Sequence, residues 1–269
     1  MNSTADSPET MPRKDAWRPL RYLVRTPFVL LHVFVGLPMT VLALSPPLAG
    51  IPIGRKRLGH AMTSWWSGTF VRLFGFRIRV FGKAQAGAVM YVANHLSWLD
   101  IELMHSQRAI SFVAKSEIER WPVVGWLATR GGTIYHRRGS NDSMANVVAQ
   151  ATDRLRDGLA VGIFPEGGTG RGDVVRTFHA RIFQAALDAE VPVQPVALRY
   201  GRNGRQDLSM PFAAKEPFFV NLLRVLGNPS MDAEVHFLDV VEPAPDARRR
   251  MAEQSRARIV DTLGYVLLL

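Results

Sequence analysis

A histidine followed five residues later by an aspartate, in the stretch NHLSWLD, is the pair best suited to acid–base chemistry. His95 follows an apolar, β-prone run, and Asp100 lies at the start of a predicted helix. Imidazole titrates near neutrality, and a carboxylate that binds its ring fixes the tautomer and stabilises the protonated form. A second interpretation stays open, because Ser97 and Asp100 also have the spacing of a capping box. In that case they satisfy the first amides of the helix, and His95 is an ordinary loop residue.

Further polar side chains and glycines follow other predicted strands, at the point where each strand ends. In open α/β sheets the carboxyl ends of the strands converge on the ligand crevice. We therefore expect these residues to share one site with His95. They are Asn94 after the strand 88–93, Arg137 after 133–136, and Glu166, Gly167 and Gly168 after 159–164.

The composition of the chain limits which chemical groups and which partners the protein can use. With 269 residues, of which 47% are apolar and 21% charged, the chain can bury one substantial core. It has no cysteine, which excludes disulfides, thiolate nucleophiles and Cys-ligated metal or iron–sulfur sites. The net charge of +10 predicts attraction to a polyanion: nucleic acid, phosphorylated metabolites or an anionic membrane surface.

The N-terminal part has the pattern of a membrane-associated element. Residues 1–17 are polar and predicted to form a disordered tail, whereas residues 26–54 carry no charged side chain and have basic residues on both sides. About 20 apolar residues suffice to cross a bilayer. However, Pro38 lies within the run and Pro46-Pro47 end it. We favour a helix or broken helical hairpin that enters one leaflet and returns over a single span, and over a buried core helix.

The next segment, residues 57–74, combines aromatic and basic side chains at helical spacing, which suits a membrane interface. An ordinary amphipathic packing helix is the alternative. Because no helix-turn-helix, zinc or RNP pattern is present, we expect no nucleic acid partner and assign the positive charge to membrane association. Residues 18–75 are therefore predicted to form a membrane-associated helical element.

Residues 76–269 alternate predicted strands and helices. This pattern predicts one α/β domain with a mostly parallel central sheet flanked by helices. The strand 191–200 carries Pro192 and Pro195, which predicts an edge strand or an irregular bend. The apolar segment PFFVNLLRVLG, within 208–229, is interpreted as a lid or a second membrane-facing patch.

Four motifs in order, NHLSWLD, GGTIYHR, FPEGG and VPVQPV, resemble those of the glycerolipid acyltransferase family that contains 1-acylglycerol-3-phosphate O-acyltransferase. The resemblance spans about residues 55–240. It implies that His95 is a general base oriented by Asp100, deprotonating a lysolipid hydroxyl as it attacks an acyl thioester. The donor would be acyl carrier protein or coenzyme A thioester, with no cofactor, no metal and no acyl-enzyme intermediate.

The same resemblance assigns the other site residues. Arg137 and Lys115 would hold the phosphate of the acceptor, although Lys115 is alternatively a solvated residue at a helix start. Glu166 would accept from a glycerol hydroxyl or position a basic partner. The motifs also place Asn94, Gly167 and Gly168 in the substrate site. Pro195 belongs to the fourth motif and would shape the acyl site.

Two departures concern the acceptor. After Gly168 the chain continues Thr169-Gly170 where many members have Thr-Arg-Ser, so Arg171 or Arg176 would have to replace that arginine. These changes resemble the branch that acylates lyso-ornithine lipid. We rank lysophosphatidic acid first, which gives phosphatidic acid as product, and lyso-ornithine lipid second. His136 and His179 lack partners at metal-ligand spacing and are interpreted as polar surface residues.

Two other functions remain open from the sequence: a non-catalytic module that binds anionic lipid, and a hydrolase that releases acyl chains to water. In each case we expect the protein at the cytoplasmic face of the cell membrane, as a monotopic or single-anchor protein.

Overall fold

The computed structural model describes residues 15–54, 56–121, 124–137, 141–213, 216–244 and 247–265. Most of the predicted tail, residues 1–14, lies outside this range. Among the described residues the main sheet has the strand order β3-β10-β8-β4-β7-β5-β6, with β9 paired to β8. Its strands are β3 (Phe76–Phe81), β4 (Val89–Ala93), β5 (Ser111–Lys115), β6 (Ile134–His136), β7 (Ala160–Ile163), β8 (Val193–Arg202), β9 (Arg205–Gln206) and β10 (Met231–Phe237).

Five neighbouring strands, β8, β4, β7, β5 and β6, run parallel to one another. β10 is antiparallel to β8 and parallel to β3. The prediction of a mostly parallel sheet is confirmed. Its consequence for the site is that β4, β7, β5 and β6 all end at the same edge.

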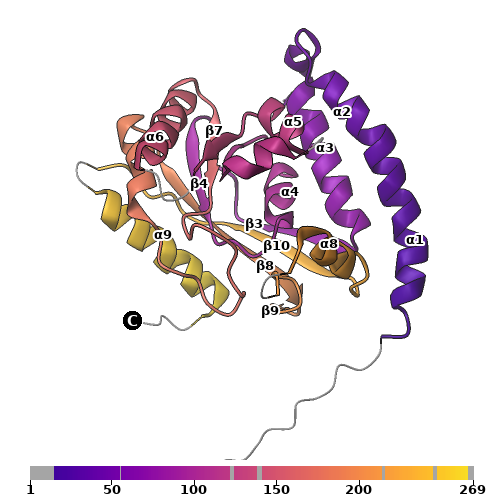
Figure 1. Cartoon of the computed structure of the whole chain (residues 1–269). Helices are drawn as coiled ribbons and strands as arrows, with labels where there is room; N and C mark the ends of the chain where they lie inside the picture. The colour runs from indigo at the N-terminus through magenta and orange to yellow at the C-terminus, as the bar shows by residue number, and fades with distance from the viewer. Residues whose placement is uncertain are drawn as a thin grey trace, which may run out of the picture.

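Helices cover both faces of the sheet (Figure 1). Along β4, Val89, Tyr91 and Ala93 pack into one core cluster, and Met90 and Val92 into the other. The first cluster lies under α3 (Leu58–Leu73), α4 (Leu99–His105) and α8 (Phe218–Leu226). The second lies under α6 (Asn141–Arg156), α7 (Gln184–Asp188) and α9 (Arg248–Leu263). Because β4 is buried on both faces, it is apolar throughout instead of alternating.

β8 is an interior strand between β10 and β4, so the edge-strand prediction is wrong. Pro195 lies opposite Leu238, whose N–H donates to the Pro195 carbonyl at 3.0 Å. Pro195 has no N–H, so it cannot donate a hydrogen bond to the Leu238 carbonyl. The side-chain amide of the neighbouring Gln194 donates to the Leu238 carbonyl instead, also at 3.0 Å. One buried glutamine thus allows a proline inside the sheet.

The N-terminal apolar segment forms one helix of 26 residues, Arg18–Ala43, long and apolar enough to cross a membrane by length and composition. It consists of α1 (Arg18–Leu31), a π-helical turn (His32–Gly36) and α2 (Leu37–Ala43). The wider π turn comes directly before Pro38, so the helix passes the proline without ending.

After Ala43 the chain turns through a short 3₁₀ segment (Leu48–Gly50) and the two-residue strands β1 (Pro52–Ile53) and β2 (Lys56–Arg57). It then returns as α3, and α1, α2 and α3 pack together along one flank of the molecule (Figure 1). The π-turn residue His32 stacks on Trp66 of α3, with ring centroids 5.4 Å apart. The remaining elements are α5 (Val124–Arg130) and the 3₁₀ segments Ser116–Arg120 and Ala180–Phe183.

Candidate active site

His95 follows β4 directly, and its ring nitrogen Nδ1 lies 2.8 Å from Oδ2 of Asp100. A carboxylate only accepts hydrogen bonds, so Nδ1 carries the proton and Nε2 is the basic nitrogen of the neutral ring. The ring stacks on Phe164 at the end of β7, with centroids 4.0 Å apart. The His95 side chain keeps 17% of its surface exposed, whereas Asp100 has none. Asp100 and Phe164 therefore hold the imidazole from two sides, and a solvent path remains.

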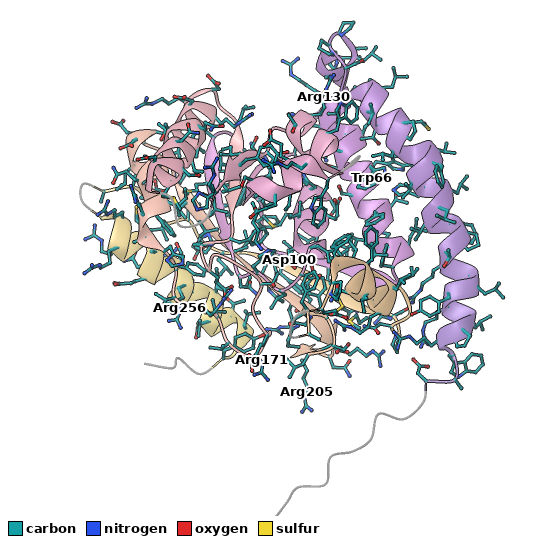
Figure 2. The ribbon with its side chains drawn as sticks, viewed as in Figure 1. Trp66, Asp100, Arg130, Arg171, Arg205 and Arg256 are labelled. Carbon is teal, nitrogen blue, oxygen red and sulfur yellow. The ribbon has the colours of Figure 1, made fainter. Side chains whose placement is uncertain are left out.

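Asp100 also binds the backbone before α4. Besides the ring of His95, Oδ2 accepts the backbone N–H groups of Leu96 and Ser97, at 2.6 and 2.9 Å. The contact with the ring has the geometry that the orienting interpretation requires, whereas the N-cap of α4 is Trp98 and has no side-chain cap hydrogen bond. Figure 2 shows Asp100 in the interior of the molecule, where α4 meets the sheet.

Tyr200 is a member of this network that sequence reasoning missed. It is fully buried on β8, and its hydroxyl donates to Oδ1 of Asp100 at 2.7 Å. Burial and the neighbouring carboxylate raise the pKa of Tyr200 well above its ordinary value, so the hydroxyl keeps its proton. Asp100 therefore has four donors. Its buried charge is held chiefly by hydrogen bonds, with the imidazole as one of them.

Asn94 joins β4 to β8 at the base of the site. Its Nδ2 donates to the Leu198 carbonyl at 3.0 Å, and its Oδ1 accepts the Leu198 N–H at 2.8 Å. The side chain is buried and uses both ends on the backbone of β8. This bridge fixes the position of the end of β4, which immediately precedes His95.

Glu166 binds the backbone on both sides of the site. Its Oε1 accepts the His95 N–H at 2.8 Å, and its Oε2 accepts the Arg176 N–H at 2.9 Å. The guanidinium of Arg176 adds a contact to Oε2 at 3.4 Å. Burial raises the pKa of Glu166, and the bonds from Arg176 and His95 lower it in part. Glu166 ties β7 and the following loop to the histidine.

The glycines after Glu166 form a tight turn. Gly167 has φ +73°, and a Cβ there would lie 3.3 Å from Nε2 of His179. The Gly168 carbonyl accepts from Arg176, and the Gly170 N–H donates to the His95 carbonyl at 2.6 Å. The loop therefore crosses over the histidine. Arg171 points away into solvent, as Figure 2 shows.

The predicted basic residues Lys115 and Arg137 lie at the same edge of the sheet as His95, but several strands away from it. Lys115 ends β5, opposite His136 of β6, and Arg137 follows β6. Both are exposed. With strands about 4.8 Å apart, β5 and β6 lie about 10 and about 14 Å from β4. The sequence prediction that these strand ends share an edge agrees with the structure. The acceptor-binding roles assigned to them stay predictions.

The remaining predicted residues lie away from the edge or at the surface. Pro195 pairs with Val92 in the middle of the sheet, below the level of His95. His136 contacts the Ser143 hydroxyl at 3.1 Å, and His179 is exposed beside the glycine turn. The acyl-site role of Pro195 stays a prediction.

The chain is similar to several known proteins of one family. A family model described as Acyltransferase matches residues 77–199. The lyso-ornithine lipid O-acyltransferase of Pseudomonas aeruginosa PAO1 is 36% identical over 88% of this chain and 90% of the relative. The 1-acyl-sn-glycerol-3-phosphate acyltransferase of Neisseria gonorrhoeae is 33% identical over 64% of this chain and 70% of the relative.

The fold has a counterpart among solved structures. The crystal structure of the 1-acyl-sn-glycerophosphate acyltransferase PlsC from Thermotoga maritima is similar with a TM-score of 0.67. It covers 94% of this chain and 100% of its own, at 19% identity. That likeness shows the fold.

Proposed function

The chain belongs to the acyltransferase family, and from this premise we propose that it transfers a fatty acyl chain from a thioester to the free hydroxyl of a lysolipid. The observation that carries the proposal is the Asp100 contact on Nδ1 of His95, which leaves Nε2 as the base. Nε2 takes the hydroxyl proton while the hydroxyl oxygen attacks the thioester carbonyl carbon. The tetrahedral intermediate then expels the thiolate, which receives the proton from His95.

Lyso-ornithine lipid is the acceptor that we propose first. Two named lyso-ornithine lipid O-acyltransferases match about 90% of this chain, at 36% and 31% identity, whereas the Neisseria phosphate-acceptor enzyme matches 64%. The loop also supports this order. Arg176, which could have replaced the missing phosphate-binding arginine, is paired with Glu166. This order reverses the ranking made from the sequence, which placed lysophosphatidic acid first as the commonest acceptor of the family that the motifs resemble.

Lysophosphatidic acid remains the second candidate, with phosphatidic acid as product. Lys115 and Arg137 favour it because both are exposed cations at the edge that carries His95. The same two cations suit the carboxylate of an ornithine headgroup, so they support either acceptor. The proposed donor is acyl carrier protein or coenzyme A thioester, and the transfer as written uses no cofactor or metal.

We further propose a monotopic enzyme at the cytoplasmic face of the cell membrane. The apolar N-terminal helix and the lipid acyltransferase relatives together indicate membrane association. The helix meets the α/β part near both of its ends: Tyr22 bonds to α8, and Val41 lines one small cavity together with Trp126 of α5. At about 1.5 Å per residue it is about 39 Å long. A perpendicular span would draw the attached polar part into the hydrocarbon, so the helix lies along one leaflet.

The test is an assay with a labelled acyl donor and both lysolipids offered in parallel. We expect diacyl product from wild type and a loss of about 10²- to 10⁴-fold in His95→Ala. His236→Ala, in a histidine that bonds Glu234 on β10, is the matched control and should keep full activity. Free fatty acid without diacyl product would identify a hydrolase. No product above background from either wild type or His95→Ala would leave a lipid-binding module.

A further inference from the structure

We infer that α8 is a second membrane-contacting element, fastened to the N-terminal helix and to the motif that carries His95. This inference rests on the proposed function, because it gives the lipid acceptor a defined route to the site. Three α8 side chains carry it: Phe219, Val220 and Leu223 are 74%, 52% and 54% exposed. They lie at positions i, i+1 and i+4 and so form one helix face.

The opposite face of α8 is buried in the core. Asn221 and Val225 are fully buried, and Leu222 packs against the core cluster of that sheet face. α8 is therefore a two-sided helix whose outer side is apolar instead of polar. An apolar outer face with this geometry is typical of a helix that lies in the membrane interface.

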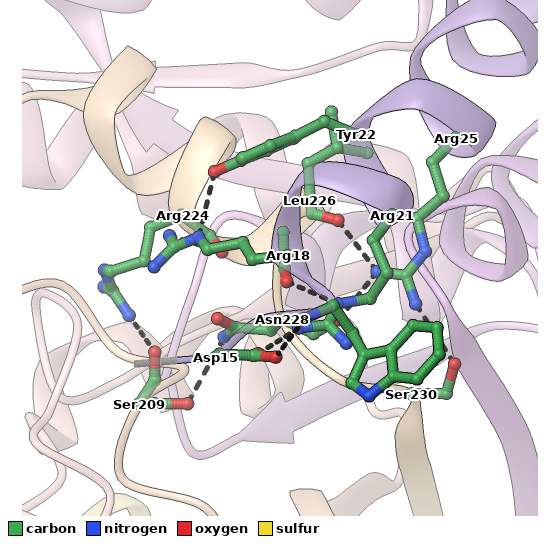
Figure 3. A network of polar contacts seen from close by, with 12 residues as sticks. Asp15, Arg18, Arg21, Tyr22, Arg25, Ser209, Arg224, Leu226, Asn228 and Ser230 are labelled. Atoms are coloured by element: carbon green, nitrogen blue, oxygen red, sulfur yellow. Dashed lines mark hydrogen bonds and ion pairs between the residues drawn. The ribbon is translucent and has the colours of Figure 1, made fainter. Parts of the chain in front are cut away.

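The end of α8 is bound to α1 by a set of side chains that we call the arginine latch (Figure 3): Arg18, Arg21, Tyr22 and Arg25. Tyr22 Oη donates to the Leu223 carbonyl at 2.9 Å. Arg21 donates to the Gly227 carbonyl at 2.7 Å. The Gly227 carbonyl, at the C-cap of α8, is one that a helix end leaves without an intrahelical partner, whereas the Leu223 carbonyl also accepts the Gly227 N–H at 3.1 Å.

Arg25 completes the latch with donors at 2.8 Å to the carbonyls of both Leu226 and Asn228. Glycine at 227 is needed for this close approach, because a Cβ there would lie 2.7 Å from both Arg18 and Tyr22. The latch fixes α8 beside α1, as Figure 1 also shows.

The fastening sets α8 beside a helix that has an exposed apolar side of its own. On α1 the exposed apolar side chains Leu20, Leu23, Val24, Phe28 and Leu31 run along one side. The latch residue Tyr22, whose hydroxyl reaches Leu223 of α8, lies on another side of the same helix. The apolar face of α8 is thus held next to α1, which is apolar enough to enter a bilayer.

α8 also contacts the motif that carries His95. Nε1 of Trp98 donates to Oδ1 of the buried Asn221 at 2.9 Å. The ring of Phe218 lies edge-on to Trp98 at 5.7 Å and to the exposed Trp121 at 5.5 Å. Trp98 stands two residues before Asp100. A bilayer held by α8 therefore lies next to the site where a lipid hydroxyl must meet His95.

The occupant of this face that we propose is a lipid bilayer. A second protein copy is the weaker fit, because α8 and α1 together offer nine exposed large apolar side chains and a stable protein interface takes roughly 20–30 residues a side. The latch arginines Arg21 and Arg25 are bound to backbone carbonyls, and Arg224 of α8 itself is paired with Glu216. Contact at this point therefore depends on apolar insertion.

The test uses the full chain, which has no cysteine, so that one introduced cysteine gives one labelled position. Leu223→Cys and the control Leu159→Cys, an exposed apolar residue before β7, are labelled with a nitrobenzoxadiazole dye. The proteins are reconstituted into vesicles with or without bromine-labelled acyl chains. We expect bromolipid to quench the dye at position 223 and to leave the dye at 159 unchanged.

Iodide in the water should give the reverse order of quenching. A dye at 223 that iodide quenches as strongly as the dye at 159, and that bromolipid does not quench, overturns the inference. The inference is also overturned if the dye at 223 becomes better shielded from iodide as the protein concentration rises and is not quenched by bromolipid. That result would favour a second copy of the protein. Because this readout needs no turnover, it is independent of whether the proposed acyl transfer is correct.

A kinetic arm uses Phe219→Ser/Leu223→Ser against Leu159→Ser. The measured quantity is the rate on bilayer-embedded lysolipid divided by the rate on detergent-dispersed lysolipid. We expect this ratio to fall about tenfold in the double variant and to stay at the wild-type value in the control. An unchanged ratio in the double variant counts against the inference.

Discussion

Replacing Tyr200 with phenylalanine tests how the charge of Asp100 is held. The variant removes a single hydroxyl, which is fully buried and lies 2.7 Å from the Asp100 carboxylate. Three donors remain on Asp100: the His95 ring and the N–H groups of Leu96 and Ser97. The carboxylate therefore stays in place but loses a quarter of its donors.

The expected loss of stability follows from the acceptor's charge. A hydrogen bond to a charged group contributes about 1.5–3 kcal/mol, and a neutral one about 0.5–1.5 kcal/mol. At roughly 2–4 °C per kcal/mol for a domain of this size, Tyr200→Phe should lower Tm by about 3–12 °C. The rate should fall by about tenfold or less, because His95 keeps its contact with Asp100.

The matched control is Tyr91→Phe. Tyr91 is equally buried on β4, and its hydroxyl donates at 2.8 Å to the Gln85 carbonyl and accepts from Arg108 at 3.2 Å. Because one of these partners is charged, we expect this control to lose about 1.5–3 kcal/mol as well, but with an unchanged rate. Tm from thermal melting and kcat/KM from labelled acyl transfer are measured on both variants. If Tyr200→Phe and Tyr91→Phe gave equal changes in both quantities, the reasoning about Asp100 would be refuted.

Three further predictions follow from other contacts. Glu166→Gln keeps one acceptor oxygen, whereas the carboxylate uses two, one for the His95 N–H and one for the Arg176 N–H. We expect kcat/KM to fall about tenfold. An unchanged value would contradict the role of Glu166 as a bridge between these two segments. Burial raises the pKa of Glu102 to about 7, so between pH 4.5 and about 7 the folded protein holds a proton that the unfolded chain has lost. The free energy of unfolding of wild type should therefore fall by about 3 kcal/mol as pH rises through this window, whereas that of Glu102→Gln should not. A Tm that changes with pH by the same amount in both proteins would be inconsistent with this. Arg25→Ala removes the donors to two carbonyls at and after the end of α8, those of Leu226 and Asn228, and should destabilise the protein by about 2 kcal/mol. Chemical denaturation measures this loss, and equal midpoints for variant and wild type would contradict it.

The part of the site that sequence reasoning could predict is local in the chain. His95 and Asp100 are five residues apart, so one motif contains both the base and its orienting group. The strand ends before His95 and Glu166 could be predicted to converge because parallel strands of an α/β sheet end at one edge. Both predictions depend on periodicity and on short-range spacing.

The contacts that were missed join segments far apart in the chain. Tyr200 is 100 residues from Asp100, and Leu198 is 104 residues from Asn94. Both contacts depend on β8 pairing with β4, which no local pattern indicates. The position of Pro195 was mispredicted for a related reason. The compensating donor is a side chain, Gln194, and its use could be recognised only with β10 in place.

The arginine latch also sets an order of events during synthesis. Its partners lie 201 to 206 residues farther along the chain. At roughly 5–20 residues per second, the ribosome needs on the order of ten to forty seconds between adding the latch residues and adding their partners. Throughout that interval the newly made apolar helix has no α8 to dock against. A nascent chain of this design must rest its first helix on lipid or on a chaperone until the final third emerges.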